Sequence, residues 1–251
     1  MAGDLVISTI NGQAIGTKNV IIDGNFNVNQ RGVSGTVTLA AGAYGHDRWK
    51  GGASGCTYTF ATVENVTTLT ISAGSLVQVV EGLNLQSGAY TLSFSGTAQG
   101  KINGGSYSAS GVTGTATGGT NMSIEFNTGT LSLVQLEKGS TATSFDYRPY
   151  GTELALCQRY YVKLDGSNNG MWWQGYALTG QNLANSFTNP VTMRVSPTQA
   201  IYGTWTVANT AQPAGGGAST SLSSIFGQAL ANGMVQYYST ATAGMTLSAE
   251  L

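Results

Sequence analysis

The stretch Ala89-Tyr90-Thr91-Leu92-Ser93-Phe94-Ser95 alternates apolar and small polar residues with a period of two. A second stretch, Leu131-Ser132-Leu133-Val134-Gln135-Leu136, repeats this alternation with one slip. A period of two puts every other side chain on the same face of a β-strand, so that one face is apolar and the other polar. Both stretches are therefore predicted to be half-buried antiparallel strands of one sandwich core.

Other short segments share β-branched or aromatic residues and are bounded by Gly, Ser, Asn or Pro, which is typical of strands joined by turns. They are residues 37–39, 57–63, 68–71, 77–80 and 122–126, and later 171–178, 193–195, 200–207 and 235–238. Residues 99–120 are dominated by Gly, Ser and Ala, which leaves a flexible loop and a weak hairpin as alternatives. Residues 212–217 are predicted to form a loop.

Residues 153–161, reading Glu-Leu-Ala-Leu-Cys-Gln-Arg-Tyr-Tyr, contain the best helix formers of the chain and follow Pro149 and Gly151. We expect a short connecting helix here that leads into a strand. The chain has 251 residues, enough for two modest β domains with cores of their own. The sequence thus predicts an all-β fold with an N-terminal arm or edge strand at 1–18, a β-sandwich at 19–150, and a second, smaller β domain at 151–251.

Charge is scarce in this chain. Asp, Glu, Lys and Arg make up 8% of the residues, against roughly 25% in ordinary soluble domains. The surface must therefore be solvated mainly by hydroxyl and amide groups, which suits fibres, spikes and repeated subunits. The formal net charge is −1 and no run of Lys or Arg occurs, so nucleic acid is not expected as a partner.

The first residues show no basic segment followed by an apolar one, and the chain has no run of about 18 apolar residues. We therefore expect that the chain is made in a cytoplasm and does not insert into a membrane. Cys56 and Cys157 belong to no metal-binding spacing. Buried, reduced thiols are expected for both, with a disulfide as the alternative.

Several motifs together carry a resemblance to a known family. Residues 19–32 read Asn-Val-Ile-Ile-Asp-Gly-Asn-Phe-Asn-Val-Asn-Gln-Arg-Gly and are followed by Asp47-Arg48-Trp49. Residues 135–149 read Gln-Leu-Glu-Lys-Gly-Ser-Thr-Ala-Thr-Ser-Phe-Asp-Tyr-Arg-Pro, and the helix-prone segment 153–161 comes next. Residues 190–198 and the ending Ser248-Ala249-Glu250-Leu251 complete the set. In this order the motifs resemble the carbohydrate-binding-module-like surface proteins of tailed-phage virions, namely tail fibres, spikes and head fibres.

That resemblance implies a lectin-like jelly-roll sandwich in the first domain and a second β domain after it. It spans all but the first eighteen residues, and it departs from the family at Asn29, where Trp is often found. Lectin-like sandwiches of this kind often hold a structural calcium near the start of the fold. Asp23, Asn25 and Asn27 present oxygens at alternate positions and are the candidate ligands, although the glycine turn and terminal Glu of an EF-hand are missing. No other cofactor is expected.

The densest aromatic cluster is Met171-Trp172-Trp173-Gln174-Gly175-Tyr176. Aromatic faces beside amides suit sugar C–H surfaces and hydroxyls, so Trp172, Trp173 and Tyr176 are candidate ligand-binding residues. Neighbouring residues of a strand point to opposite faces, so at least one of the two tryptophans is expected in the core. The other then serves a ligand or a subunit contact, because interfaces also enrich aromatics.

Catalytic signals are weak. His46 is the only histidine and no nucleophile motif accompanies it. Asp47, Arg48 and Trp49 are expected to be structural, through an ion pair and a buried ring. Glycosidase chemistry needs two carboxylates about 5 to 10 Å apart, and nothing in the sequence brings together two of the candidates Glu64, Glu81, Glu125 and Glu137. We therefore expect no catalytic residues.

The leading hypothesis is a non-enzymatic virion surface protein that binds host surface glycans for adsorption. Its alternatives are a purely structural capsid or tail decoration subunit and, less favoured, a polysaccharide-degrading enzyme. The expected partners are other copies of the chain, other virion proteins and host cell-surface polysaccharide, at the virion surface. A homotrimer is expected because from Tyr160 onward the only charged residues are Lys163, Asp165, Arg194 and Glu250, while this region is rich in aromatics and Met. The threefold symmetry is implied by the resemblance.

Overall fold

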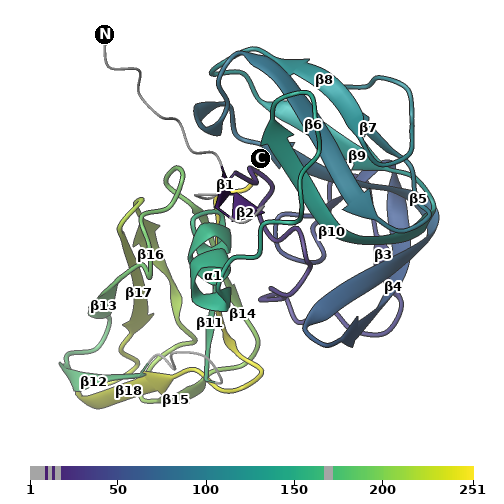
Figure 1. Cartoon of the computed structure of the whole chain (residues 1–251). Helices are drawn as coiled ribbons and strands as arrows, with labels where there is room; N and C mark the ends of the chain where they lie inside the picture. The colour runs from purple at the N-terminus through teal and green to yellow at the C-terminus, as the bar shows by residue number, and fades with distance from the viewer. Residues whose placement is uncertain (1–8, 11–12, 15–17, 167–171) are drawn as a thin grey trace, which may run out of the picture. The chain divides into compact units, whose positions relative to one another are not determined.

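The computed structural model describes residues 9–10, 13–14, 18–166 and 172–251 (Figure 1). The chain divides into two compact units, Met1–Glu153 together with Leu251, and Leu154–Glu250. Most of the predicted arm at 1–18 lies outside the described residues. Its described part includes β1 (Thr9–Ile10) and β2 (Gln13–Ala14), which form a two-stranded antiparallel sheet of their own.

The predicted all-β fold with a sandwich and one short helix is confirmed. In the first unit the larger sheet runs in the order β3-β4-β5-β10-β6-β8, with β9 pairing β5 and β7. The strands are β3 (Val37–Leu39), β4 (Lys50–Val63), β5 (Val66–Val80), β6 (Gly88–Ser95), β7 (Gly100–Ile102), β8 (Val112–Ala116), β9 (Met122–Phe126) and β10 (Gly129–Lys138).

Strand β10 changes partner along its length. Residues 129–131 pair with β5, and residues 132–138 pair with β6. The change is marked by a register shift between Ser132 and Gln135, and Leu133 there has a φ of 50°. This bulge is the slip seen in the sequence pattern, because extra bulge residues shift the alternation of side chains between the two faces.

The core of the first unit is built from side chains at every other position of its strands. Tyr90, Leu92 and Phe94 are all buried, as the period of two predicts. Phe94 meets Phe126 of β9 edge to face, with ring centroids 5.0 Å apart. Within residues 99–120, β7 pairs with β9 and β8 pairs with β6, so these two strands do not form a hairpin with each other.

The second unit contains three three-stranded sheets, ordered β11-β19-β14, β12-β18-β15 and β13-β17-β16. Strands β11, β12 and β13 each start one sheet, and β14, β15 and β16 each supply a second edge strand in the same order. Strands β17, β18 and β19 then fill the central positions in the reverse order. Its strands are β11 (Tyr161–Asp165), β12 (Trp172–Ala177), β13 (Asn182–Thr188), β14 (Thr198–Tyr202), β15 (Thr206–Ala208), β16 (Ala214–Ala218), β17 (Leu222–Gln228), β18 (Gly233–Tyr238) and β19 (Gly244–Ser248). Helix α1 (Tyr150–Gln158) begins in the first unit and ends in the second.

Two expectations for this unit are wrong. Residues 193–195 form a bend rather than a strand, in which Met193 is buried and its N–H donates to the Thr220 carbonyl at 2.7 Å. The predicted loop at 212–217 overlaps β16, whose glycine-rich backbone pairs with β17 through a register shift. Its glycines have no side chains to show the strand pattern. Helix α1 is nine residues long, and no helix in the described part of the chain could cross a membrane.

Candidate functional site

Two adjacent hollows of about 340 and 460 Å³ lie in the first unit and share Asn27, Asn65 and Tyr150 as lining residues. We call them together the groove. The first hollow is also lined by Phe26, Asn29, His46, Phe60, Thr62 and Thr67, and the second by Asn25, Glu64, Tyr147, Arg148 and Glu153. The groove therefore combines aromatic rings with amides and hydroxyls.

Three segments far apart in sequence build this groove. The loop before β3 supplies Asn25 and Asn27, the β4–β5 turn supplies Asn65, and the segment after β10 supplies Tyr147 and Tyr150. Asn27 Nδ2 donates to the Asn65 carbonyl at 2.7 Å, which ties the loop to the turn. Tyr147 and Tyr150 are 60% and 58% exposed, and the Tyr147 ring meets Phe145 edge to face with centroids 4.8 Å apart.

His46 lies in the floor of the groove and is 1% exposed. Its ring meets Phe60 edge to face at 4.6 Å, and Nδ1 lies 2.9 Å from the hydroxyl of Tyr58. Burial lowers the pKa of His46 to about 4, so the imidazole is neutral at pH 7. The only histidine of the chain therefore adds an uncharged ring to the floor.

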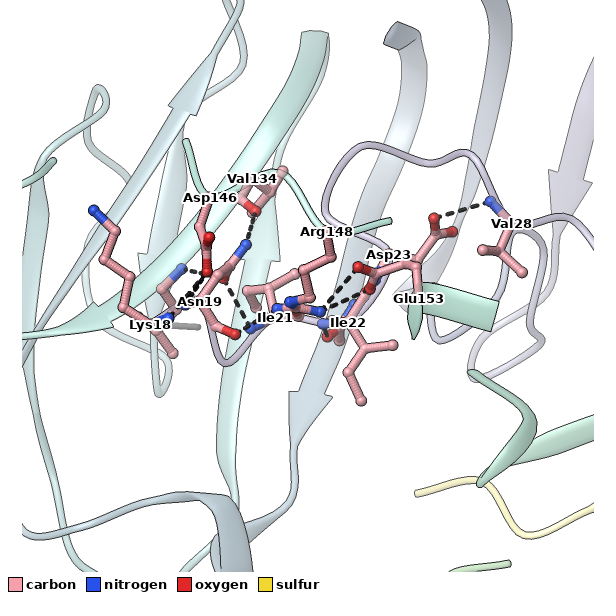
Figure 2. Close-up of polar contacts among 12 residues, drawn as sticks. Lys18, Asn19, Ile21, Ile22, Asp23, Val28, Val134, Asp146, Arg148 and Glu153 are labelled. Atoms are coloured by element: carbon pink, nitrogen blue, oxygen red, sulfur yellow. Dashed lines mark hydrogen bonds and ion pairs between the residues drawn. The ribbon is translucent and has the colours of Figure 1, made fainter. Parts of the chain in front are cut away.

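A buried network fastens the segment after β10 to the first loop (Figure 2). Arg148 Nη1 lies 2.9 Å from both carboxylate oxygens of Glu153, while Nη2 donates to the Ile21 carbonyl at 2.7 Å and to the Asn19 carbonyl. Glu153 Oε1 also accepts from the N–H of Asp23. Because Tyr147 and Tyr150 flank Arg148, this network holds both rings beside the loop that carries Asn25 and Asn27.

The candidate calcium ligands do not form a ready cage. Asp23 is completely buried, and its Oδ1 accepts from the N–H of Val28 at 3.0 Å while Oδ2 has no hydrogen-bond partner. Burial raises the pKa of Asp23 well above its usual value, against the lowering effect of the Val28 bond, and Asp47 and Glu153 raise it further. Asn27 Oδ1 already accepts from Thr67.

Calcium takes six to eight oxygen ligands, and this set offers one uncommitted carboxylate oxygen. The described residues contain no group of three or more His, Cys, Asp or Glu placed to hold a metal. Calcium at Asp23, Asn25 and Asn27 therefore stays a prediction.

Asp47, Arg48 and Trp49 have structural contacts. Trp49 is fully buried and donates from Nε1 to the Asp23 carbonyl at 2.9 Å. Arg48 Nη2 donates to the Val79 carbonyl at 2.8 Å, and Asp47 accepts from the backbone and side chain of Gln30 at 2.7 Å each. Asp47 Oδ1 also lies 3.8 Å from Arg31 Nη1, so Asp47 forms an ion pair with Arg31.

The aromatic cluster of the second unit divides between two faces of β12. Trp173 packs against the core of this unit and stacks on Tyr237, with centroids 5.7 Å apart and planes 20° apart. Tyr176 is 65% exposed and pairs in register with Met234, which is 61% exposed. The side chain of Trp172 lies outside the described part of the structure. Trp173 and Tyr176 are thus not brought together on one face.

Among the four candidate carboxylates, Glu125 and Glu137 are held by neighbouring side chains. Glu125 accepts from Tyr107 and pairs with Lys101 at 3.0 Å, and Glu137 accepts from Thr143 at 2.7 Å. Glu81 is buried, and Glu64 is exposed at the β4–β5 turn. Of the four, Glu64 alone lines the groove.

The sequence reasoning missed Tyr147, Tyr150 and Asn65 as site residues. The available signal was two tyrosines on either side of Arg148, between the predicted strand at 131–136 and the helix-prone segment at 153–161, in a chain where charged residues are rare. Comparisons with family models, with curated proteins and with solved structures found no match. The fold is all-β, and the first unit carries a groove lined by aromatic rings, amides and hydroxyls as its candidate site.

Proposed function

We propose that the protein is a non-enzymatic surface protein of a tailed-phage virion, a tail fibre, head fibre or spike, and that its groove binds host cell-surface glycans. The observation that carries the proposal is the pair of exposed rings, Tyr147 and Tyr150, beside the amides of Asn25, Asn27 and Asn65. The phage origin is supported by the sequence motifs at residues 19–32, 47–49 and 135–149.

The chemistry of the groove suits a saccharide. Aromatic faces pack against the C–H faces of sugar rings, and amides donate to and accept from hydroxyls. A ligand pocket of this kind needs a few convergent polar groups on an apolar floor, which here comes from Phe26, His46 and Phe60.

Binding without hydrolysis is favoured by the state of the carboxylates. Glu153 is the second carboxylate of the groove besides Glu64, and its oxygens are taken by Arg148 and the N–H of Asp23. A glycosidase needs one free acid and one free base across the scissile bond. The groove offers Glu64 as its one exposed carboxylate.

The second unit supports a role in assembly. Trp205 and Met193, two of the aromatic and Met residues that make this region rich in such side chains, lie in the core of this unit. Exposed apolar residues of this unit include Leu178, Val195, Leu222 and Leu230 as well as Tyr176, Met234 and Tyr238, of which the last three lie on one sheet, β12-β18-β15. Exposed apolar patches of this kind mark protein contacts. We place the homotrimer contact, or a contact with other virion proteins, on this face.

The same face favours a second candidate, a capsid or tail decoration subunit that stabilises the particle without binding glycans. Binding of the purified chain to isolated host surface polysaccharide, followed by a reducing-end assay of the mixture, separates the candidates. The proposal expects saturable binding and no new reducing ends. Absence of binding would favour the decoration subunit, and release of reducing ends would identify an enzyme.

A further inference from the structure

The charges of the groove point to a narrower class of ligand, on the basis that the proposed function holds. Its lining residues include one guanidinium, that of Arg148, whose side chain is 4% exposed. Both terminal nitrogens of Arg148 are bonded to Glu153 and to backbone carbonyls. His46, the other nitrogen base in the lining, is buried against Phe60 and Tyr58. Neither group offers a cation to a ligand.

The carboxylate of Glu64, in contrast, belongs to an exposed residue. Glu64 and Asn65 form the two-residue turn between β4 and β5, with φ angles of 49° and 62°. Such turns prefer Asn and Gly, and a left-handed non-glycine residue costs on the order of 1 kcal/mol. A Glu at the first of these positions is therefore not explained by turn formation.

The turn is also held in place. Asn27 Nδ2 donates to the Asn65 carbonyl at 2.7 Å, and the hydroxyls of Thr62 and Thr67 lie 2.8 Å apart across the two strands. Thr67 further donates to Asn27 Oδ1 at 3.0 Å. These bonds fix the backbone of the turn, so the side chain of Glu64 starts from a defined position at the rim of the groove.

We infer that the groove selects neutral saccharides over acidic ones, and that Glu64 is the residue that sets this selectivity. A sugar hydroxyl donates a charge-assisted hydrogen bond to a carboxylate. A uronic acid or sulfate group meets a like charge instead, and the lining residues supply no free cation to offset it. A like charge at about 6 Å in water lowers affinity about threefold at low salt, and salt screens the effect.

The test compares a neutral oligosaccharide series with a uronic-acid series of equal length, at low and high salt, by calorimetry. The proteins are the full chain, Glu64→Gln and Glu64→Lys, with Glu64→Asn as a variant suited to the left-handed turn. Leu83→Lys is the control for net charge, because Leu83 is 81% exposed and does not line the groove. Melting curves verify that each variant folds.

The full chain and Leu83→Lys should bind neutral sugars about threefold or more tightly than acidic ones at low salt, with a smaller ratio at high salt. Glu64→Gln and Glu64→Asn should remove the preference, and Glu64→Lys should reverse it. Equal or tighter binding of acidic sugars by the full chain, or a preference that survives in all Glu64 variants, would overturn the inference while leaving glycan binding intact. Failure to bind either series would overturn the proposed function and the inference together.

Discussion

Arg148 Nη1 lies 2.9 Å from both carboxylate oxygens of Glu153, and the two side chains are 4% and 10% exposed. The pair fastens the segment that carries Tyr147 and Tyr150 to the loop at residues 19–23. It is therefore a structural support of the groove, and its removal should affect the stability of the whole first unit.

Replacing Arg148 by Met should lower the free energy of unfolding by about 3 to 5 kcal/mol, because it leaves the Glu153 carboxylate buried without its partner. Lys138→Met is the matched control. Lys138 is exposed and donates to Gln86, so its loss should cost about 0.5 kcal/mol or less. Urea unfolding measures both, and a loss below about 1 kcal/mol for Arg148→Met would contradict the supporting role.

His46 should destabilise the protein in acid. Its pKa in the folded state is about 4, against an ordinary value of 6.5, so its neutral form is favoured by folding. The contribution to stability is complete above pH 6.5 and is lost as pH falls toward 4, up to a total of about 3 kcal/mol. His46→Gln cannot take up this proton, and the fall in stability from pH 7 to pH 4 should be smaller in the variant. Equal falls in the two proteins would show that His46 is solvated.

Asp23 should act in the opposite direction. Burial raises its folded pKa, so folding favours the protonated acid, and stability falls as pH rises from the ordinary value near 3.8 through the raised value. Asp23→Asn keeps an acceptor for the N–H of Val28 and removes the titrating group. The free energy of unfolding of the variant should therefore not show this fall with rising pH. An unchanged pH profile would contradict a neutral Asp23.

The parent chain and Asp23→Asn also test the calcium prediction. If calcium binds at Asp23, Asn25 and Asn27, millimolar calcium should raise the melting temperature of the parent chain and leave that of Asp23→Asn unchanged. The same melting temperature with calcium and with chelator in the parent chain would remove the calcium site.

The oligomer prediction rests on Tyr176 and Met234, which face outward as a pair on β12 and β18. Light scattering at micromolar concentration should give the mass of a trimer, and Met234→Glu should shift it toward the monomer because the charge would have to be buried. Leu83→Glu, at a residue that is 81% exposed in the first unit, should leave the mass unchanged. A monomeric parent chain would contradict the assembly role.

The sandwich strands could be predicted because Tyr90, Leu92 and Phe94 recur at every second position, and a period of two indicates a β-strand with one apolar face. Residues 193–195 have the same composition as a strand, yet Met193 enters the core from a bend, which local sequence does not distinguish. The strand β16 was hidden because three of its five residues are glycines and carry no pattern.

The groove could not be predicted because its residues are separated by up to 128 positions, from Asn25 to Glu153. Their proximity depends on bonds such as Asn27 to the Asn65 carbonyl and Arg148 to the Ile21 carbonyl. Trp173, in contrast, was a candidate because of its type, and the structure assigns it to a core stack with Tyr237. Residue type alone did not distinguish a ligand platform from a core ring.

The most direct test of the account is the affinity of three proteins for host surface polysaccharide, measured side by side: the parent chain, Tyr150→Ala and Tyr176→Ala. The two tyrosines are comparably exposed, at 58% and 65%, but Tyr150 lines the groove and Tyr176 lies on the outer face of β12. We expect Tyr150→Ala to weaken the affinity per groove about tenfold, and Tyr176→Ala to keep the affinity per groove of the parent chain when both are measured with a short oligosaccharide of this polysaccharide that one groove can hold. Binding that is lost in Tyr176→Ala and retained in Tyr150→Ala would contradict it and return the ligand site to the second unit.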